Sequence, residues 1–322
     1  MKISFTLLLT LFIATLLSAQ ISILEQGANI DSSYYDIYKV AKNEIWLGGE
    51  YGILKRIVSD NKIEQIPIPN NGANILKIIR EGNYVYIAAD RGTIYKYNLE
   101  TKQCIRKEFP TYEKKCFYDI AIDNDGNLLV CGGNSRIARG KKAIPNGFIA
   151  TIDSSLNFTP NVIWNNKRKF VWALIKDKNN TINAAVFNGV NSAIYCLNNE
   201  NKNWNKNYKI KGLIHGLSEV NGEIYYAGSA SINYQKSGIW GKINSSEEHH
   251  KIENSGLICN IFSTQSFVYG LTQQGKLLQL NNNELICESD FKYPFYEAIL
   301  GNEDTVYLVG HGKLIYQVKL KL

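Results

Sequence analysis

A short motif recurs about every forty residues along this chain, and that period restricts the folds it can adopt. In its clearest copy, an apolar segment at 44–49 ends on a glycine pair and is followed by a second strand-like segment at 52–56. The next clear copy has the same order at 84–89, which ends on two alanines, and at 92–97. The segments have the length and the aromatic and β-branched composition of strands. The period therefore predicts a repeated unit of antiparallel sheet.

Seven copies of the unit are found when the innermost strand of each is aligned. The aligned residues are Asp36, Lys77, Asp119, Ala173, Gly216, Asn260 and Ala298. Their spacings are 41, 42, 54, 43, 44 and 38 residues. Helical patterning is nearly absent, so we expect each unit to be a blade of four antiparallel strands. The sequence predicts an all-β, seven-bladed β-propeller, whose second strands are apolar on both faces because neighbouring blades cover them.

The two ends of the repeat are incomplete in complementary ways. The last unit supplies three strands, whereas residues 21–25 form one strand without a blade. Pairing of these fragments would complete the last blade and remove the exposed edges that an open ring leaves. We therefore expect the ring to be closed by the N-terminal strand. No linker or change of composition divides the ring, so residues 20–322 are predicted to form a single propeller domain.

The first nineteen residues have the layout of a secretory signal peptide. Lys2 precedes an apolar run at 3–17, and small residues at 18 and 19 provide a cleavage site before Gln20. The run is shorter than a membrane-spanning helix, and no stop-transfer pattern follows it, which argues against a retained anchor. We expect residues 1–19 to be removed, the remaining chain not to insert into a membrane, and its location to be secreted or periplasmic.

The charge of the chain favours solubility and acidic partners over nucleic acid. The full sequence carries 36 Lys and Arg against 29 Asp and Glu, a formal net charge of +7. Nearly all Tyr and Trp follow strand periodicity, so they do not form a stacking surface beside a basic stripe. Nucleic-acid binding is therefore not expected. We expect no cofactor, since the sequence has no nucleotide fingerprint in a plausible context. We also expect the chain to be a monomer.

The six cysteines are an even number in a chain expected to be exported, which allows disulfides but does not assign them. Cys104 and Cys116 flank one connection between blades and are the first pair to test. Cys131 and Cys196 fall on predicted inner strands and are expected to be buried thiols. The histidine pair at 249–250 would point to opposite faces of a strand and could share an ion only from a loop. No metal site is predicted.

The first repeat resembles those of two known propeller families. Residues 43–56 are similar to the repeat of bacterial two-component-regulator sensor propellers and to that of Ycf48-like photosystem II assembly factors. The first resemblance implies an extracytoplasmic ligand-sensing domain, and the second implies an assembly or scaffold protein. The Ser/Thr-Asp-Gly-Gly and Trp turn that usually follows the third strand of Ycf48-like repeats is missing here. The resemblance therefore implies the fold and a binding role.

A binding site is expected where the loops between second and third strands and the loops between blades surround the axial channel. The longest of these loops is also the most basic and would give the channel a cationic mouth rimmed by tyrosine. Guanidinium groups suit carboxylates, so an acidic glycan or an acidic protein surface is the expected ligand. Alternatively, the basic residues of this loop bind no ligand, and their charges only keep an exposed loop hydrated. The candidate residues are Arg136, Arg139, Lys141 and Lys142 in the long loop, with Tyr35, Arg91, His215 and His311 around it.

The sequence contains no assembled catalytic constellation, so the leading interpretation is a non-enzymatic protein that binds a protein or glycan. One alternative is a polysaccharide lyase or hydrolase acting on an acidic glycan. A lyase would need Tyr, His and Arg to converge, and His215 or His311 with Arg136 is the available combination. Asp36 and Asp119 occupy equivalent positions and are either a pair of acids in the channel or structural partners. A second alternative is a ligand-sensing propeller that works in trans with a membrane partner.

Overall fold

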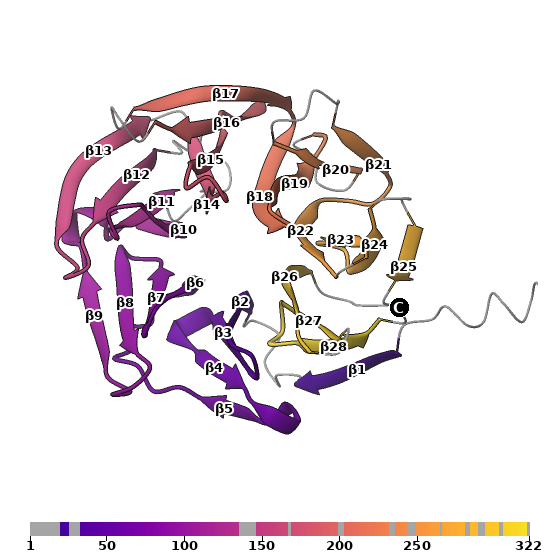
Figure 1. Cartoon of the computed structure of the whole chain (residues 1–322), viewed down its shortest axis with the longest axis horizontal. Coiled ribbons are helices and arrows are strands. Elements are labelled where there is room, and N and C mark those ends of the chain that lie inside the picture. Colours follow the sequence, from indigo (N-terminus) through magenta and orange to yellow (C-terminus); the bar gives the residue numbers. More distant parts are fainter. Residues whose placement is uncertain are drawn as a thin grey trace, which may run out of the picture.

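The chain forms a closed ring of seven four-stranded antiparallel sheets, as the repeat predicts (Figure 1). The structure is a computed structural model. It describes residues 20–25, 33–134, 146–166, 169–198, 203–231, 236–243, 249–264, 266–280, 284–288, 294–302 and 305–320.

Each blade is a meander whose first strand lies next to the axis and whose last strand lies at the rim (Figure 1). The innermost strands are β2 (Tyr34–Ala41), β6 (Ile75–Glu81), β10 (Lys115–Ile122), β14 (Phe170–Lys176), β18 (Leu213–Val220), β22 (Ile258–Ser263) and β26 (Phe295–Leu300). The second strands are β3 (Glu44–Gly49), β7 (Tyr84–Ala89), β11 (Leu128–Asn134), β15 (Ile182–Phe187), β19 (Glu223–Ser229), β23 (Val268–Thr272) and β27 (Thr305–Gly310).

The outer half of each blade is built from two further strands. The third strands are β4 (Leu54–Ile57), β8 (Thr93–Asn98), β12 (Gly147–Ile152), β16 (Asn191–Leu197), β20 (Ser237–Lys242), β24 (Lys276–Gln279) and β28 (Ile315–Lys319). The outermost strands are β5 (Ile63–Gln65), β9 (Cys104–Glu108), β13 (Phe158–Asn166), β17 (Trp204–Lys211), β21 (His250–Glu253), β25 (Glu284–Glu288) and β1 (Gln20–Glu25). The described residues also include the 3-10 helices η1 (Glu50–Gly52), η2 (Ser59–Asn61) and η3 (Pro110–Tyr112). Among the described residues, no helix has the length and hydropathy to span a bilayer.

The second strands are buried because neighbouring blades pack face to face. Strands β15 and β27 are buried at every position. Near the axis the strands converge until there is no space for a side chain: a Cβ added at Gly228 would lie 1.8 Å from the carbonyl oxygen of Leu213 on the adjacent strand. Only glycine allows that close approach of two backbones. The small residues that end the second strands are therefore a packing feature of the ring.

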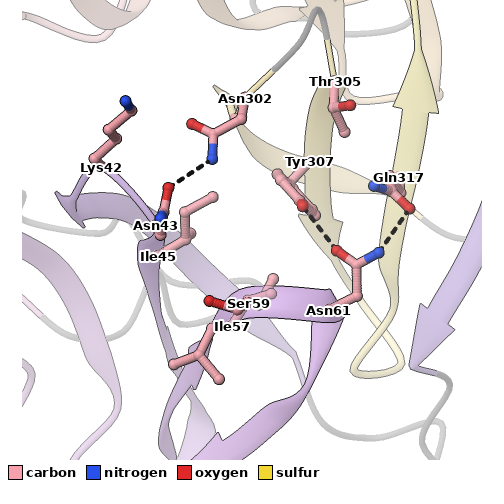
Figure 2. Close-up of a pocket in the computed structure, with 12 residues that line it drawn as sticks. Lys42, Asn43, Ile45, Ile57, Ser59, Asn61, Asn302, Thr305, Tyr307 and Gln317 are labelled. Atoms are coloured by element: carbon pink, nitrogen blue, oxygen red, sulfur yellow. Dashed lines mark hydrogen bonds between the residues drawn. The ribbon is translucent and has the colours of Figure 1, made fainter.

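The ring is closed by the N-terminal strand, which confirms the sequence prediction. Strand β1 pairs antiparallel with β28 and completes the last blade. Side chains then join this blade to the first across a groove of about 380 Å³, shown in Figure 2. Asn302 donates to the Asn43 side chain at 3.0 Å, and Tyr307 donates to Asn61 at 2.9 Å. Asn61 in turn donates to Gln317 at 3.3 Å. These side-chain hydrogen bonds link the last blade to the first, and we call this junction the seam.

Every innermost strand contains a register shift at the same place in its pairing with the second strand. At each shift one residue is left opposite no partner, which is the geometry of a β-bulge. The seven bulge residues are Tyr35, Leu76, Tyr118, Trp172, His215, Cys259 and Tyr296. The residue after each bulge is the aligned position of the repeat, with one correction: in the last blade it is Glu297, not Ala298. The bulges aim one side chain from each blade toward the axis.

Cys104 and Cys116, the first pair to test for a disulfide, are both free thiols. Cys104 lies on β9 at the rim of the second blade, whereas Cys116 lies on β10 beside the axis in the third (Figure 1). The connection between blades crosses from rim to axis, so its two ends are far apart. Cys131 is a fully buried thiol on β11, as expected, and Cys196 is half-buried on the third strand β16.

Candidate functional site

The bulge residues of all seven blades line one pocket at the end of the axial channel. Its volume is about 360 Å³. It opens at the ends of the second strands, since Tyr34, beside the first bulge, pairs with Gly49, the last residue of β3. This is the face on which the loops between second and third strands begin, where the sequence predicts a site. We call this cavity the mouth pocket; besides the bulge residues it is lined by Lys77, Asp119, Ala173, Gly216, Leu217, Ser218, Asn260 and Glu297.

Aromatic rings form two groups in the wall of the mouth pocket. Trp172 lies 5.0 Å from the Tyr118 ring and 6.0 Å from the His215 ring, with interplanar angles of 33° and 22°. The second group comes from the first and last blades, where the ring centroids of Tyr35 and Tyr296 lie 5.5 Å apart. Aromatic side chains supply a large contact area at a low cost in conformational entropy. The wall is therefore suited to holding a ligand.

The hydroxyl groups of two wall tyrosines are bonded away from the pocket. Tyr35 donates to Glu50 at 2.6 Å, and Tyr118 donates to the carbonyl oxygen of Asn134 at 3.2 Å. Burial, and for Tyr35 the adjacent Glu50, raises the pKa of both phenols, so both stay neutral. Burial lowers the pKa of His215, against a backbone hydrogen bond at Cys259 that raises it. At neutral pH the wall therefore consists of uncharged rings.

Charged side chains of the innermost strands meet at the floor of the mouth pocket. Lys77 donates to Asp36 Oδ1 at 3.0 Å, and its Nζ lies 3.9 Å from Glu297 Oε2. The other oxygen of Asp36 accepts the backbone N–H of Ile78 at 2.7 Å. Burial opposes the charge on Lys77, but the surrounding carboxylates outweigh it and raise the pKa. The lysine therefore stays protonated and is held by Asp36.

Asp36 and Asp119 are structural clamps between blades. Asp119 accepts the backbone N–H of Ile120 and, in the next blade, that of Leu174, both at 2.8 Å. Asp36 makes the same kind of bond to the next blade through Ile78. Burial raises the pKa of Asp119 to about 6, although Lys77 and the two N–H groups lower it. Of the two interpretations left open by the sequence, the geometry supports the structural one.

Three polar groups in the mouth pocket keep bonding capacity. Burial raises the pKa of Glu297 to about 8, with Lys77 acting against it and Asp36 adding to it. Among the described residues, no hydrogen-bond partner is found for the buried Oδ1 of Asn260 or for the buried Nε1 of Trp172. Buried polar atoms normally have partners, and those that lack one in a cavity are available to a ligand. Glu297, Asn260 and Trp172 are therefore the candidate recognition groups.

Of the eight predicted site residues, the structure describes four, and it places them in three different environments. Tyr35 and His215 lie in the mouth pocket. Arg91 lies in a turn outside it and donates to the Asn71 carbonyl oxygen at 3.2 Å. His311 Nδ1 lies 3.0 Å from the Ser33 hydroxyl at the seam. The four basic loop residues fall outside the described residues: Arg136, Arg139, Lys141 and Lys142.

The alternatives from the sequence can be compared with the pocket. Of the Tyr, His and Arg that a lyase would need, Tyr35 and His215 converge in the mouth pocket, and the cation beside them is Lys77. The histidine pair at 249–250 lies elsewhere: His250 is on the outermost strand β21 and stacks on Trp240, with ring centroids 4.3 Å apart.

Sequence analysis missed most of the pocket. The alignment of the repeats includes Lys77 and Asn260 without giving them a ligand-binding role, and Tyr118, Trp172 and the pair at 296–297 were not among the predicted site residues. The signal that could have found them is the position before each aligned residue, which is aromatic or His in four of the seven repeats, and in five once the last blade is aligned on Glu297. Unless the bulge is known, a residue at that position cannot be distinguished in the sequence from any other strand residue.

The channel continues beyond the charged floor into a wider cavity on the opposite face. This cavity has a volume of about 610 Å³ and shares Lys77, Asp119 and Glu297 with the mouth pocket. Its wall is mainly aliphatic, with residues such as Ile79 and Leu174. The charged residues therefore separate an aromatic end of the channel from an aliphatic one.

Comparisons with known proteins show the fold. No protein-family model matches the sequence, and no curated protein does. Among solved structures, the chain is similar to a catalytically inactive virginiamycin B lyase from Staphylococcus aureus with quinupristin, at 15% identity and a TM-score of 0.71 over 94% of this chain and 100% of that one. It is also similar to YCF48 bound to D1 peptide, at 12% identity and a TM-score of 0.65 over 94% and 96% of the two chains. The Pan2 WD40 domain of Neurospora crassa has 11% identity and a TM-score of 0.64 over 90% of each. These matches confirm the resemblance to Ycf48 propellers in fold.

Proposed function

We propose that this chain is a non-enzymatic binding protein whose partner is a protein segment that enters the mouth pocket. The observation that carries the proposal is the convergence of seven bulge side chains, five of them aromatic or His, on one cavity. Bulges recur next to binding sites because they redirect single side chains. A rigid ring holds these groups in place without a ligand, which reduces the entropy lost on binding.

Two of the similar structures support a ligand at this kind of site. One is a propeller bound to a peptide, and the other is a propeller that holds quinupristin. At these low sequence identities, the similarity shows that this chain shares the fold, but it does not show that it binds the same ligands. The peptide complex nevertheless favours a protein partner over a glycan, and the long basic loop at residues 134–145 would add contacts to acidic residues of that partner.

Trp172→Ala and Tyr296→Ala are each expected to weaken partner binding at least about tenfold, because buried aromatic side chains dominate interface energies. The measurement is the binding of residues 20–322 to arrays of short random peptides and of glycans. Tyr84→Ala is the matched control, since Tyr84 is 37% exposed and lies outside the lining of the mouth pocket. Changing Arg136, Arg139, Lys141 and Lys142 together to Ala tests the loop, and is expected to cost less than either aromatic substitution.

Several outcomes would overturn the proposal. Binding that survives both aromatic substitutions would place the site elsewhere. If ligands were found only on the glycan array, the partner would be a carbohydrate and not a protein. Turnover of a bound molecule would make the chain an enzyme and return the lyase alternative. Thermal melts of all variants show whether a loss of binding is a loss of folding.

We also propose that the chain is exported after removal of residues 1–19. The proposal rests on the signal-peptide pattern and on strand β1, which begins at Gln20, the first residue after the expected cleavage. Cleavage at that point would leave the closing strand intact. The expected result is that protein recovered from the periplasm or medium of a bacterial host has the mass of residues 20–322. A full-length mass in the membrane fraction would contradict it.

A further inference from the structure

The floor of the mouth pocket has more acidic than basic groups. Of the residues that the structure describes, the carboxyls of the floor are Asp36, Asp119 and Glu297, and the cation beside them is Lys77. This imbalance is local, because the whole chain carries a net charge of +7. A negatively charged ligand group would meet the carboxylates at close range, where the low dielectric of the pocket strengthens repulsion. The floor therefore selects against anions.

Two of the three carboxyls bond to the next blade. Asp36 is bonded to Lys77 and Ile78, and Asp119 is bonded to the backbone N–H groups of Ile120 and Leu174. Glu297 accepts a hydrogen bond from the backbone of Ala298 in its own strand, and its Oε2 lies 3.9 Å from Lys77 Nζ, so its closest cation is beyond hydrogen-bonding distance. A buried carboxylate needs a charged partner. Glu297 is therefore the group whose ionised form a cation from outside would stabilise most.

The surroundings of Glu297 suit a cation that carries N–H groups. Asn260 follows the bulge of the sixth blade as Glu297 follows that of the seventh, and its unpartnered Oδ1 can accept a hydrogen bond. The rings of Tyr118, Trp172 and Tyr296 line the same pocket. Ring faces attract cations by about 0.5–2 kcal/mol each. The unpartnered Trp172 N–H can donate to a carbonyl oxygen beside the cation.

We propose that the mouth pocket takes a basic side chain, lysine or arginine, from the protein partner, with Glu297 as its counter-charge and Asn260 as a hydrogen-bond acceptor. The inference rests on the proposed function, because it assumes that a protein segment enters this pocket. It adds the chemistry of the anchoring residue.

The proposal includes a dependence of binding on pH. Burial holds Glu297 protonated at neutral pH in the empty pocket, and the cation must displace that proton. Binding of arginine is therefore expected to strengthen as the pH rises from about 6 to about 9, because the carboxylate is then already ionised. The titratable or charged groups facing Glu297 are Asp36 on β2, Lys77 on β6, Asp119 on β10 and Cys259 on β22.

The test uses residues 20–322 and two capped pentapeptides, with arginine or its uncharged analogue citrulline at the centre of four glycines. Capping leaves the guanidinium as the sole charge. The expected result in calorimetric titration is at least about tenfold tighter binding of the arginine peptide. Glu297→Gln is expected to abolish this preference and its pH dependence, and Asn260→Leu to weaken binding of the arginine peptide. The Tyr84→Ala control is expected to keep the preference.

The outcomes separate this inference from the proposed function. Equal binding of the two pentapeptides, both lost in Trp172→Ala, would overturn the basic anchor and leave the mouth pocket as a protein-binding site. An arginine preference that persists in Glu297→Gln would remove Glu297 as the counter-charge and overturn the inference. Failure of both peptides to bind at millimolar concentration would also count against it. The proposed function falls independently if array ligands ignore the aromatic substitutions.

Discussion

Replacing Asp36 with alanine is expected to lower the free energy of unfolding by about 3–5 kcal/mol, the cost of breaking a buried ion pair. The side chain is 1% exposed, and its two oxygens bind Lys77 and the backbone of Ile78 in the next blade. Its removal leaves the ammonium of Lys77, whose side chain is 29% exposed, without its nearest counter-charge, and it leaves a buried N–H without an acceptor. Denaturant unfolding of wild type and variant measures the difference.

Two further variants separate the charge from the hydrogen bond. In the Asp36→Ala and Lys77→Met double variant no uncompensated ammonium remains, so it is expected to be more stable than Asp36→Ala alone. Asp123→Ala is the comparison for a carboxylate that accepts two backbone N–H groups within its own turn, between β10 and β11, and bonds to no other blade through them. Its loss is expected to cost about 1 kcal/mol. If Asp36→Ala cost no more than Asp123→Ala, the clamp between blades would have no special role in stability.

The repeat made the fold predictable because it depends on local patterns. Strand segments such as 44–49, and turns between them, are set by composition and recur at a fixed period. The closing pairing of β1 with β28 was also predictable, since an unpaired strand at one end of the chain matched a missing strand at the other. These features need no knowledge of which side chains face the axis.

The site was only partly predictable because it depends on register. A bulge shifts the strand by one residue and changes which side chains turn toward the axis. For this reason the alignment chose Ala298 in the last blade, where the structure has Glu297. Trp172 likewise looked like an ordinary strand residue. Lys77 and Asp36 are 41 positions apart in sequence, and only ring geometry brings them within 3.0 Å.

The charged floor couples the stability of the ring to its binding site. Asp36 and Asp119 bond to neighbouring blades, so their carboxylates are structural, whereas Glu297 accepts a hydrogen bond from the backbone of Ala298 in its own strand and lies 3.9 Å from Lys77 Nζ. Burying the carboxyl of Glu297 is expected to lower the stability of the folded chain, and a residue that lowers stability is typical of a functional site. The pH dependence of folding therefore offers a measure of this cost that requires no ligand.

Glu297 is expected to make the folded chain less stable as the pH rises, and Glu297→Gln is expected to remove that loss. Burial, with Lys77 opposing it and Asp36 adding to it, raises the pKa of Glu297 from 4.5 to about 8. Between these values the folded state binds more protons than the unfolded state, so the free energy of unfolding falls until the pH has passed about 8. With the side chain 18% exposed, the loss is on the order of 2 kcal/mol, reduced by solvent screening.

The measurement is the difference in unfolding free energy between Glu297→Gln and wild type, obtained from denaturant titrations between about pH 5 and pH 9. Other groups also titrate in this range: Asp119, with its raised pKa, shifts stability in the same direction, and His215, with its lowered pKa, shifts it in the opposite one. Both remain in the variant, so subtraction largely cancels their effects. The difference is expected to be small near pH 5 and to favour the variant near pH 9. A difference that does not change with pH would show that Glu297 is ionised throughout, and Lys77 would then already be its counter-charge.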